Sequence, residues 1–172
     1  MNKKSISIVL IFTVLIIITF VSLKLNNQSV EIQKNLLNRA EFILIDGMNE
    51  ITLSQNNIKH YGEEEFNAVL DTSSSDAKLH NYVGIQLKKI IFSNNVDIKD
   101  KEAVIISAAD GYSVAYSIEE VLKDDNIYIA YMEDGKYLGN RENGGRGPYE
   151  SIVVSDMFSN RRCKWVTKIE VR

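Results

Sequence analysis

Cysteine and histidine are scarce in this sequence, and their scarcity excludes the commonest kinds of metal site. The single cysteine, Cys163, excludes an intramolecular disulfide and any metal centre built from several thiolates. The two histidines, His60 and His80, stand apart without the carboxylates or cysteine that would complete a ligand set. The sequence therefore predicts no metal centre made by its own side chains.

An excess of positive charge is also missing. The chain has 20 lysines and arginines against 23 aspartates and glutamates, and the part after Lys24 has 17 against 23, a net charge of −6. Nucleic-acid backbones are bound by lysine and arginine clustered on one face of a protein. The charge balance thus excludes nucleic acid as a partner.

What the sequence does contain is a long apolar run between Lys4 and Lys24, without charge, glycine or proline. As a helix with a rise of about 1.5 Å per residue, this run nearly spans the ~30 Å hydrocarbon core of a membrane. Lys3 and Lys4 before it are expected to keep the N-terminus in the cytoplasm, which places the C-terminal domain outside the cell membrane.

The apolar run fits two interpretations, a cleaved signal peptide and a permanent single-pass anchor. Signal peptides have an apolar stretch of about 7–15 residues, followed by small residues of the Ala-x-Ala kind. Here the run is longer, and Lys24, Leu25 and Asn26 follow it. The pattern favours the anchor. We expect residues 1–25 to contain it, residues 26–40 to form a helical stalk, and residues 41–172 to fold as one domain.

The pattern of the domain predicts an α+β fold, with mixed or antiparallel sheets and short helices. Serine caps predict brief helices after Ser54 and after Ser117, and Glu120 completes a capping box with Ser117. A helix-like spacing of apolar residues predicts a core helix over 82–92 with Gly84 at its entrance, and polar residues predict a loop over 71–78. Strands are expected over these ranges: 41–53 with a turn at Asp46-Gly47, 64–70, 102–116 with a turn at Asp110-Gly111, 126–138 with a turn at Asp134-Gly135, 151–154 and 164–171.

Four short segments give the domain a resemblance to a known family. They are Gly84-Ile85-Gln86-Leu87, Ala109-Asp110-Gly111-Tyr112-Ser113, Gly147-Pro148-Tyr149, and the stretch from Arg161 to Ile169. In order and spacing they resemble the Gly-Val-Pro-Leu helix start, the Asp-Gly-Tyr-Ser turn, the Gly-Pro-Leu/Tyr strand start and the Arg-Ser-Val-Lys-Trp pattern of the molybdopterin-binding domain of the sulfite oxidase family. The resemblance is to the compact stand-alone bacterial form and covers residues 42–171.

The resemblance implies a metal ligand that this chain lacks. In enzymes of the family, molybdenum is held by the pterin dithiolene and by a cysteine thiolate upstream of the segment that matches Gly84. No cysteine occurs there, and Cys163 is expected to be a small buried strand residue. Glu150 and Val154 stand where the family has arginine and proline. Family enzymes outside the membrane are exported folded behind twin arginines, whereas this chain begins Met1-Asn2-Lys3-Lys4 and is expected to cross unfolded, without a pterin.

Basic residues near the C-terminus form the candidate site. Arg146, Arg161, Arg162 and Lys164 are the charges that a pocket for an anion would use, and the resemblance places Arg161 and Lys164 on family positions. Asp110 and Tyr112 are expected to border this pocket. The alternative is a solvated strand end. Likewise, residues 144–147 either cradle an anion with backbone amides or form a plain flexible loop.

Together these features predict a membrane-anchored extracytoplasmic domain, non-catalytic and without a cofactor, that binds a small anionic ligand or an envelope protein. Two alternatives remain. One is an oxidoreductase that holds molybdopterin without the cysteine, with Arg161 and Lys164 on its phosphate. The other is a purely structural interaction domain of the envelope.

Overall fold

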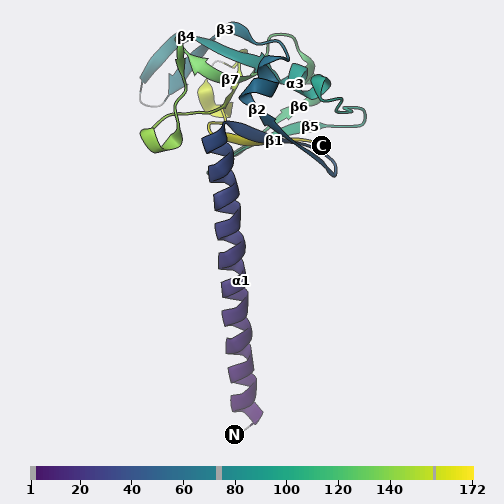
Figure 1. The fold of residues 1–172 in the computed structure, drawn as a ribbon, viewed down its shortest axis with the longest axis vertical. Helices are drawn as coiled ribbons and strands as arrows, with labels where there is room; N and C mark the ends of the chain where they lie inside the picture. The colour runs from purple at the N-terminus through teal and green to yellow at the C-terminus, as the bar shows by residue number, and fades with distance from the viewer. Residues whose placement is uncertain (1–2, 73–74, 157) are drawn as a thin grey trace. The chain divides into compact units, whose positions relative to one another are not determined.

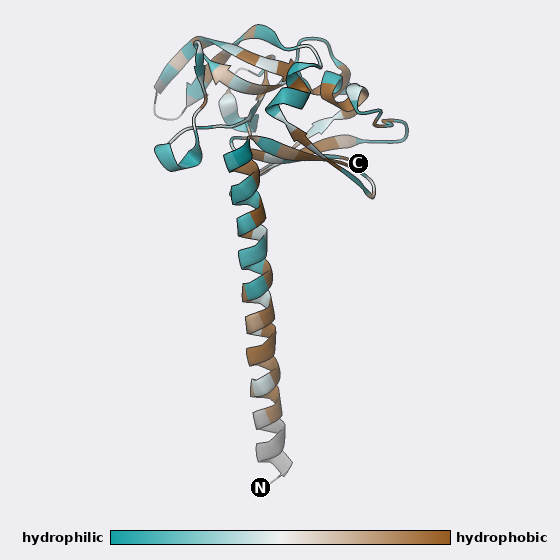
Figure 2. Cartoon of the chain, in the orientation of Figure 1, coloured by the Kyte–Doolittle hydropathy of each residue, from teal (hydrophilic) through white to brown (hydrophobic). Residues whose placement is uncertain are grey.

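A computed structural model describes residues 3–72, 75–156 and 158–172, and it divides the chain into a first unit that ends at Asn35 and a second that spans Leu36–Arg172. The first unit consists of most of helix α1, Lys3–Arg39 (Figure 1). Within the described part of the chain, one helix is long and apolar enough to cross a membrane, with a mean hydropathy of 1.9. Figure 2 shows apolar residues along the middle of this helix and polar residues toward Arg39.

Two sheets build the second unit (Figure 1). The first has the order β2-β1-β10-β5-β6, in which β1 and β10 are parallel and the other pairs are antiparallel. The second has the order β3-β4-β7-β8, and β9 also pairs with β7. The bounds of the first sheet are β1 Glu41–Asp46, β2 Asn49–Ser54, β5 Ala103–Ala108, β6 Ser113–Ser117 and β10 Val166–Val171; those of the second are β3 Glu64–Thr72, β4 Ser75–Gln86, β7 Ile127–Glu133, β8 Lys136–Tyr137 and β9 Glu150–Val153.

Short helices connect the strands, which confirms the predicted α+β class. They are α2 Gln55–Lys59, α3 Leu87–Ser93 and α4 Ile118–Leu122, with single 3₁₀ turns η1 Arg141–Asn143 and η2 Ser159–Arg161. The two predicted serine caps are present. The Ser117 hydroxyl accepts a hydrogen bond from the Glu120 amide at 3.2 Å, and the Glu120 carboxylate accepts one from the Ser117 amide at 3.1 Å.

Two local predictions were wrong. Strand β4 runs through Gly84 to Gln86, so the core helix begins at Leu87 rather than near residue 82. The cause is tertiary, because Tyr82–Gln86 pair with β7 along the sheet. The predicted loop over 71–78 is largely strand, since β3 continues to Thr72 and β4 begins at Ser75; residues 73 and 74 lie outside the described residues.

The main core lies between the two sheets and contains buried side chains from both. Phe42, Leu44 and Ile106 come from the first sheet, and Ile85 and Ile129 come from the second. A smaller cluster covers the other face of the second sheet, where Phe66, Ala68, Tyr82, Tyr128, Ala130 and Ile152 pack together. At about 25 cal/mol per Å² of apolar surface, burial of this kind is the main stabilising term of the unit.

Candidate functional site

The glycine-rich segment 139–147 is a tightly wound loop. Gly139 and Gly144 have positive φ values of 72° and 73°. Gly145 approaches the start of the loop so closely that a Cβ there would lie 2.5 Å from the carbonyl carbon of Gly139. The indole of Trp165 fixes the loop from outside, since its N–H donates to the Gly145 carbonyl at 2.7 Å. The loop is therefore held by close contacts within it and by Trp165, and the prediction of a plain flexible loop does not describe it.

The backbone amides of this loop are used internally. Those of Gly144 and Gly145 donate to Arg141 and Asn140, at 3.1 and 2.8 Å. Those of Arg146 and Gly147 donate to carbonyls at the start of the loop, at 3.0 and 2.9 Å. An anion cradle needs N–H groups that point together at open space. The four amides of residues 144–147 do not offer this arrangement.

Arg146 is placed by the loop between two carboxylates. Its guanidinium forms a close ion pair with Glu133 of β7 and a second, at 3.0 Å, with Glu150 at the start of β9. Burial lowers the pKa of Arg146, but the two carboxylates outweigh burial and raise it. The guanidinium is thus a charged group whose counterions belong to the same chain.

Glu150 is the most deeply buried charged residue of this region, with no exposed surface. Burial raises the pKa of its carboxyl above the ordinary value, and the charges of Arg146, Arg162 and Lys164 act in the opposite direction. Arginine stays protonated in proteins, so a neutral Glu150 would leave the Arg146 charge without this partner. The paired, ionised form is the one that the surrounding charges favour.

Arg162 extends the arrangement into a chain of polar contacts. Its guanidinium donates to the Tyr82 hydroxyl at 2.9 Å and to the Val69 carbonyl at 2.6 Å, and the Tyr82 hydroxyl donates to Glu133 at 2.8 Å. The guanidinium also lies 5.1 Å from the centre of the Tyr82 ring, a cation–π contact. We call the five residues Tyr82, Glu133, Arg146, Glu150 and Arg162 the buried ion network.

Arg161, the neighbour of Arg162, points to a different set of partners. It binds Asp156 through two nitrogens, at 2.9 and 2.6 Å, and Glu120 of α4 at 2.7 Å. The hydrogen bond from Arg161 lowers the pKa of Glu120. Two carboxylates therefore neutralise this guanidinium, in the bidentate geometry that an anionic ligand would otherwise use.

The residues that were predicted to border the pocket lie against the segment that contains Arg161. The Tyr112 hydroxyl donates to the carbonyl of Asn160 at 2.9 Å, and the Tyr116 hydroxyl donates to the carbonyl of Arg161 at 2.6 Å. The Asp110 carboxylate accepts the Tyr112 amide at 3.0 Å within its own turn. Asp110, Tyr112 and Arg161 are thus brought together, whereas Arg146 belongs to the buried ion network. Lys164, three residues after Arg161, is exposed.

Cys163 is fully buried in the main core. Its backbone forms an isolated antiparallel bridge with Ser151, and its Sγ lies 3.9 Å from the carbonyl oxygens of Ile106 and Lys164. Burial raises the pKa of its thiol to about 12. The side chain is an uncharged core residue at neutral pH.

Gln86 belongs to another segment of the family resemblance, Gly84 to Leu87, and its side chain is held by three hydrogen bonds. Its amide nitrogen donates to Glu64 at 2.6 Å and to Asp125 at 2.8 Å, and its amide oxygen accepts the Asp125 backbone amide at 3.3 Å. Gln86 thereby ties β3, the start of α3 and the start of β7 together. Its contacts are structural, and no sequence pattern pointed to them.

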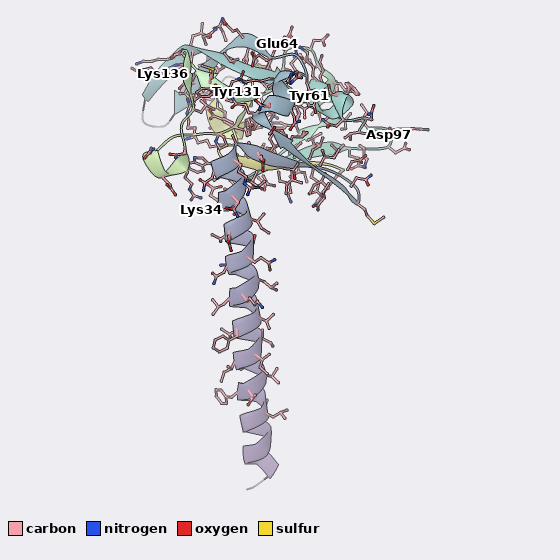
Figure 3. The ribbon with its side chains drawn as sticks, in the orientation of Figure 1. Lys34, Tyr61, Glu64, Asp97, Tyr131 and Lys136 are labelled. Atoms are coloured by element: carbon pink, nitrogen blue, oxygen red, sulfur yellow. The ribbon has the colours of Figure 1, made fainter. Side chains whose placement is uncertain are left out.

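An open cleft of about 370 Å³ lies beside the loop, where Arg146, Glu133 and Asp134 meet Lys136 and Tyr137. An apolar hollow of about 140 Å³ shares Tyr137 with it and reaches Tyr131 (Figure 3 labels Lys136 and Tyr131). The cleft walls carry carboxylates and cations together. The cleft therefore lacks the excess of positive charge that would concentrate an anion.

Comparisons with known proteins agree with this fold. A family model described as the oxidoreductase molybdopterin binding domain matches residues 43–172. The solved structure of the sulfane dehydrogenase SoxCD from Paracoccus pantotrophus is similar, with a TM-score of 0.63 and 14% sequence identity. The similarity covers 76% of this chain but 37% of that one, so the chain spans little more than a third of that protein. No curated protein matches the chain.

Proposed function

Because this chain belongs to the family of oxidoreductase molybdopterin-binding domains, we propose that it is a membrane-anchored, extracytoplasmic member that works without catalysis, as a binding domain for a protein partner. The observation that carries this proposal is the state of its one cysteine. A thiolate is the form of cysteine that binds a metal, and a thiol with its pKa raised to about 12 in the main core is not available in that form.

The residues that are present do not fit the pterin cofactor. The segment upstream of Gly84, where the family resemblance places the metal-binding cysteine, contains none. Glu150 puts a buried negative charge where the resemblance implies an arginine. A phosphate brought to this place would meet a carboxylate in a medium of low dielectric constant, where like charges repel strongly.

The arginines and the loop of the candidate site argue against a small anionic ligand. Arg146 and Arg161 each have two carboxylates as counterions, and a ligand phosphate would have to displace them. The amides of residues 144–147 donate to carbonyls within their own loop. These two guanidinium groups and the loop amides are thus already paired.

Metal content tests the loss of catalysis. Full-length protein extracted in detergent from its own host should contain molybdenum far below one atom per chain, because no thiolate is available to retain the metal. Elemental analysis gives this ratio. A family enzyme that has the cysteine, purified in parallel, shows that the extraction preserves bound metal. Stoichiometric molybdenum in this protein would overturn the proposal of a non-catalytic role.

Labelling in intact cells tests the location of the domain. Met48 at the β1–β2 turn is 100% exposed, whereas Cys163 is buried and should not react, so the native chain serves as the control. We expect a membrane-impermeant maleimide to label Met48→Cys in intact cells, because the domain lies outside. Asn2→Cys, at the cytoplasmic start, should be labelled only after lysis. The reverse pattern would place the domain in the cytoplasm.

A further inference from the structure

The backbone bridge between Ser151 and Cys163 brings charged residues of two segments close to Glu150. The Ser151 amide donates to the Cys163 carbonyl at 2.9 Å, and the Cys163 amide donates to the Ser151 carbonyl at 3.3 Å. Glu150 precedes Ser151 and Lys164 follows Cys163, so the bridge brings these two residues near each other, with the Lys164 side chain exposed. Arg162 precedes Cys163, and its buried guanidinium donates to the Tyr82 hydroxyl at 2.9 Å.

Arg146 completes the group from the glycine-rich loop. Its amide donates to the Leu138 carbonyl and its carbonyl accepts the Trp165 amide, both at 3.0 Å, so its backbone position is fixed by the loop and by the residue after Lys164. From there its Nη1 lies 3.0 Å from the Glu150 Oε2. Arg146 thus pairs with a fully buried carboxylate, and the charges of Arg162 and Lys164 also act on it.

The Glu150 carboxylate is held by charge more than by directed hydrogen bonds. Within the described part of the chain, neither of its oxygens nor the Arg146 Nη1 has a hydrogen bond of good geometry. Buried carboxylates are otherwise paired and hydrogen-bonded, because desolvation of an ion is costly. The surrounding cations offset part of this desolvation.

We propose that Arg146, Arg162 and Lys164 form an anion site whose resident anion is the chain's own Glu150 carboxylate, and that a free monocarboxylate takes its place once this side chain is removed. The inference rests on the proposed function in one respect, that no anionic cofactor fills the position. In this role the buried Glu150 keeps the three cations together in the absence of a ligand.

Chemical rescue tests this site. Removing one partner of a buried ion pair is strongly destabilising, so full-length Glu150→Ala should unfold at a temperature lower by roughly 10 °C. Because a ligand that binds only the folded form stabilises it, formate or acetate should raise this temperature progressively, compared with chloride at equal ionic strength. The native protein should show no difference between these salts.

Two further variants sharpen the result. In Glu150→Gln an amide of the same shape fills the position, so formate should have no specific effect. In the double variant Arg146→Met/Glu150→Ala the main cation is absent, and the rescue should be lost. If Glu150→Ala does not fold in chloride, its refolding yield from urea in formate against chloride provides the same comparison.

The outcomes separate this inference from the proposed function. A formate effect that is equal in native protein and in Glu150→Ala, or no effect in the variant, overturns the anion site whatever the molybdenum content is. Stoichiometric molybdenum overturns the proposed function, and a carboxylate rescue confined to Glu150→Ala would still support the site.

Discussion

Replacing Arg146 with alanine is expected to lower the free energy of unfolding of the Leu36–Arg172 unit by about 3–5 kcal/mol, because it removes one partner from a buried ion pair. The variant leaves Glu150 fully buried beside Glu133, without the guanidinium that contacts both. Urea unfolding of the full-length protein in detergent measures the loss. Trp165 is the only tryptophan and donates a hydrogen bond to Gly145, so its fluorescence reports on this loop directly.

Arg161 provides the matched control for this prediction. It also has two carboxylate partners, but its side chain is 38% exposed, and pairs in contact with water contribute little because solvent screens them. We expect Arg161→Ala to cost below about 1 kcal/mol in the same assay. Equal losses for the two variants would contradict the distinction between the buried ion network and the half-exposed pair at α4.

The parts of the fold that could be predicted are those encoded by neighbouring residues. The turns at Asp110-Gly111 and Asp134-Gly135 and the capping box of Ser117 with Glu120 depend on spacings of one to three residues, and the structure contains all three. The apolar run after Lys4 was recognised in the same way, and it is helical. Signals of this kind need no knowledge of the tertiary structure.

The contacts of the candidate site could not be predicted in this way. The sequence predicted a pocket that contains Arg146 and Arg161, but their partners Glu133 and Glu120 come from other elements of the fold. Only the register of β7 and the position of α4 decide which carboxylate meets which guanidinium. The unusual glutamate at position 150 was visible in the sequence, whereas its complete burial and its pairing with Arg146 follow from the tertiary structure.

Gly84 shows how a tertiary contact overrides a local pattern. The apolar spacing around it fits a helix, but a Cβ at this position would lie 2.6 Å from the Ile129 carbonyl oxygen and 2.8 Å from the Ala130 Cα. Both atoms belong to the backbone of β7, which β9 pairs on its other side. The glycine therefore permits a close approach of two strands at the register shift between Val83 and Gly84, and it does not mark the entrance of a helix.

Gly84→Ala is accordingly expected to destabilise the unit by about 3 kcal/mol, the upper end of the usual cost of overpacking, because neither backbone atom can move away without disturbing β9. Urea unfolding followed by Trp165 fluorescence measures this cost. Gly47→Ala is the matched control: its φ of 61° is unfavourable for alanine, but no atom lies within 4 Å, so it should lose only about 1 kcal/mol. If Gly84→Ala lowered the free energy of unfolding no more than Gly47→Ala does, the backbone of β7 would have to move away from position 84. The close approach of β4 and β7 would then be a consequence of the glycine and not a requirement of the sheet.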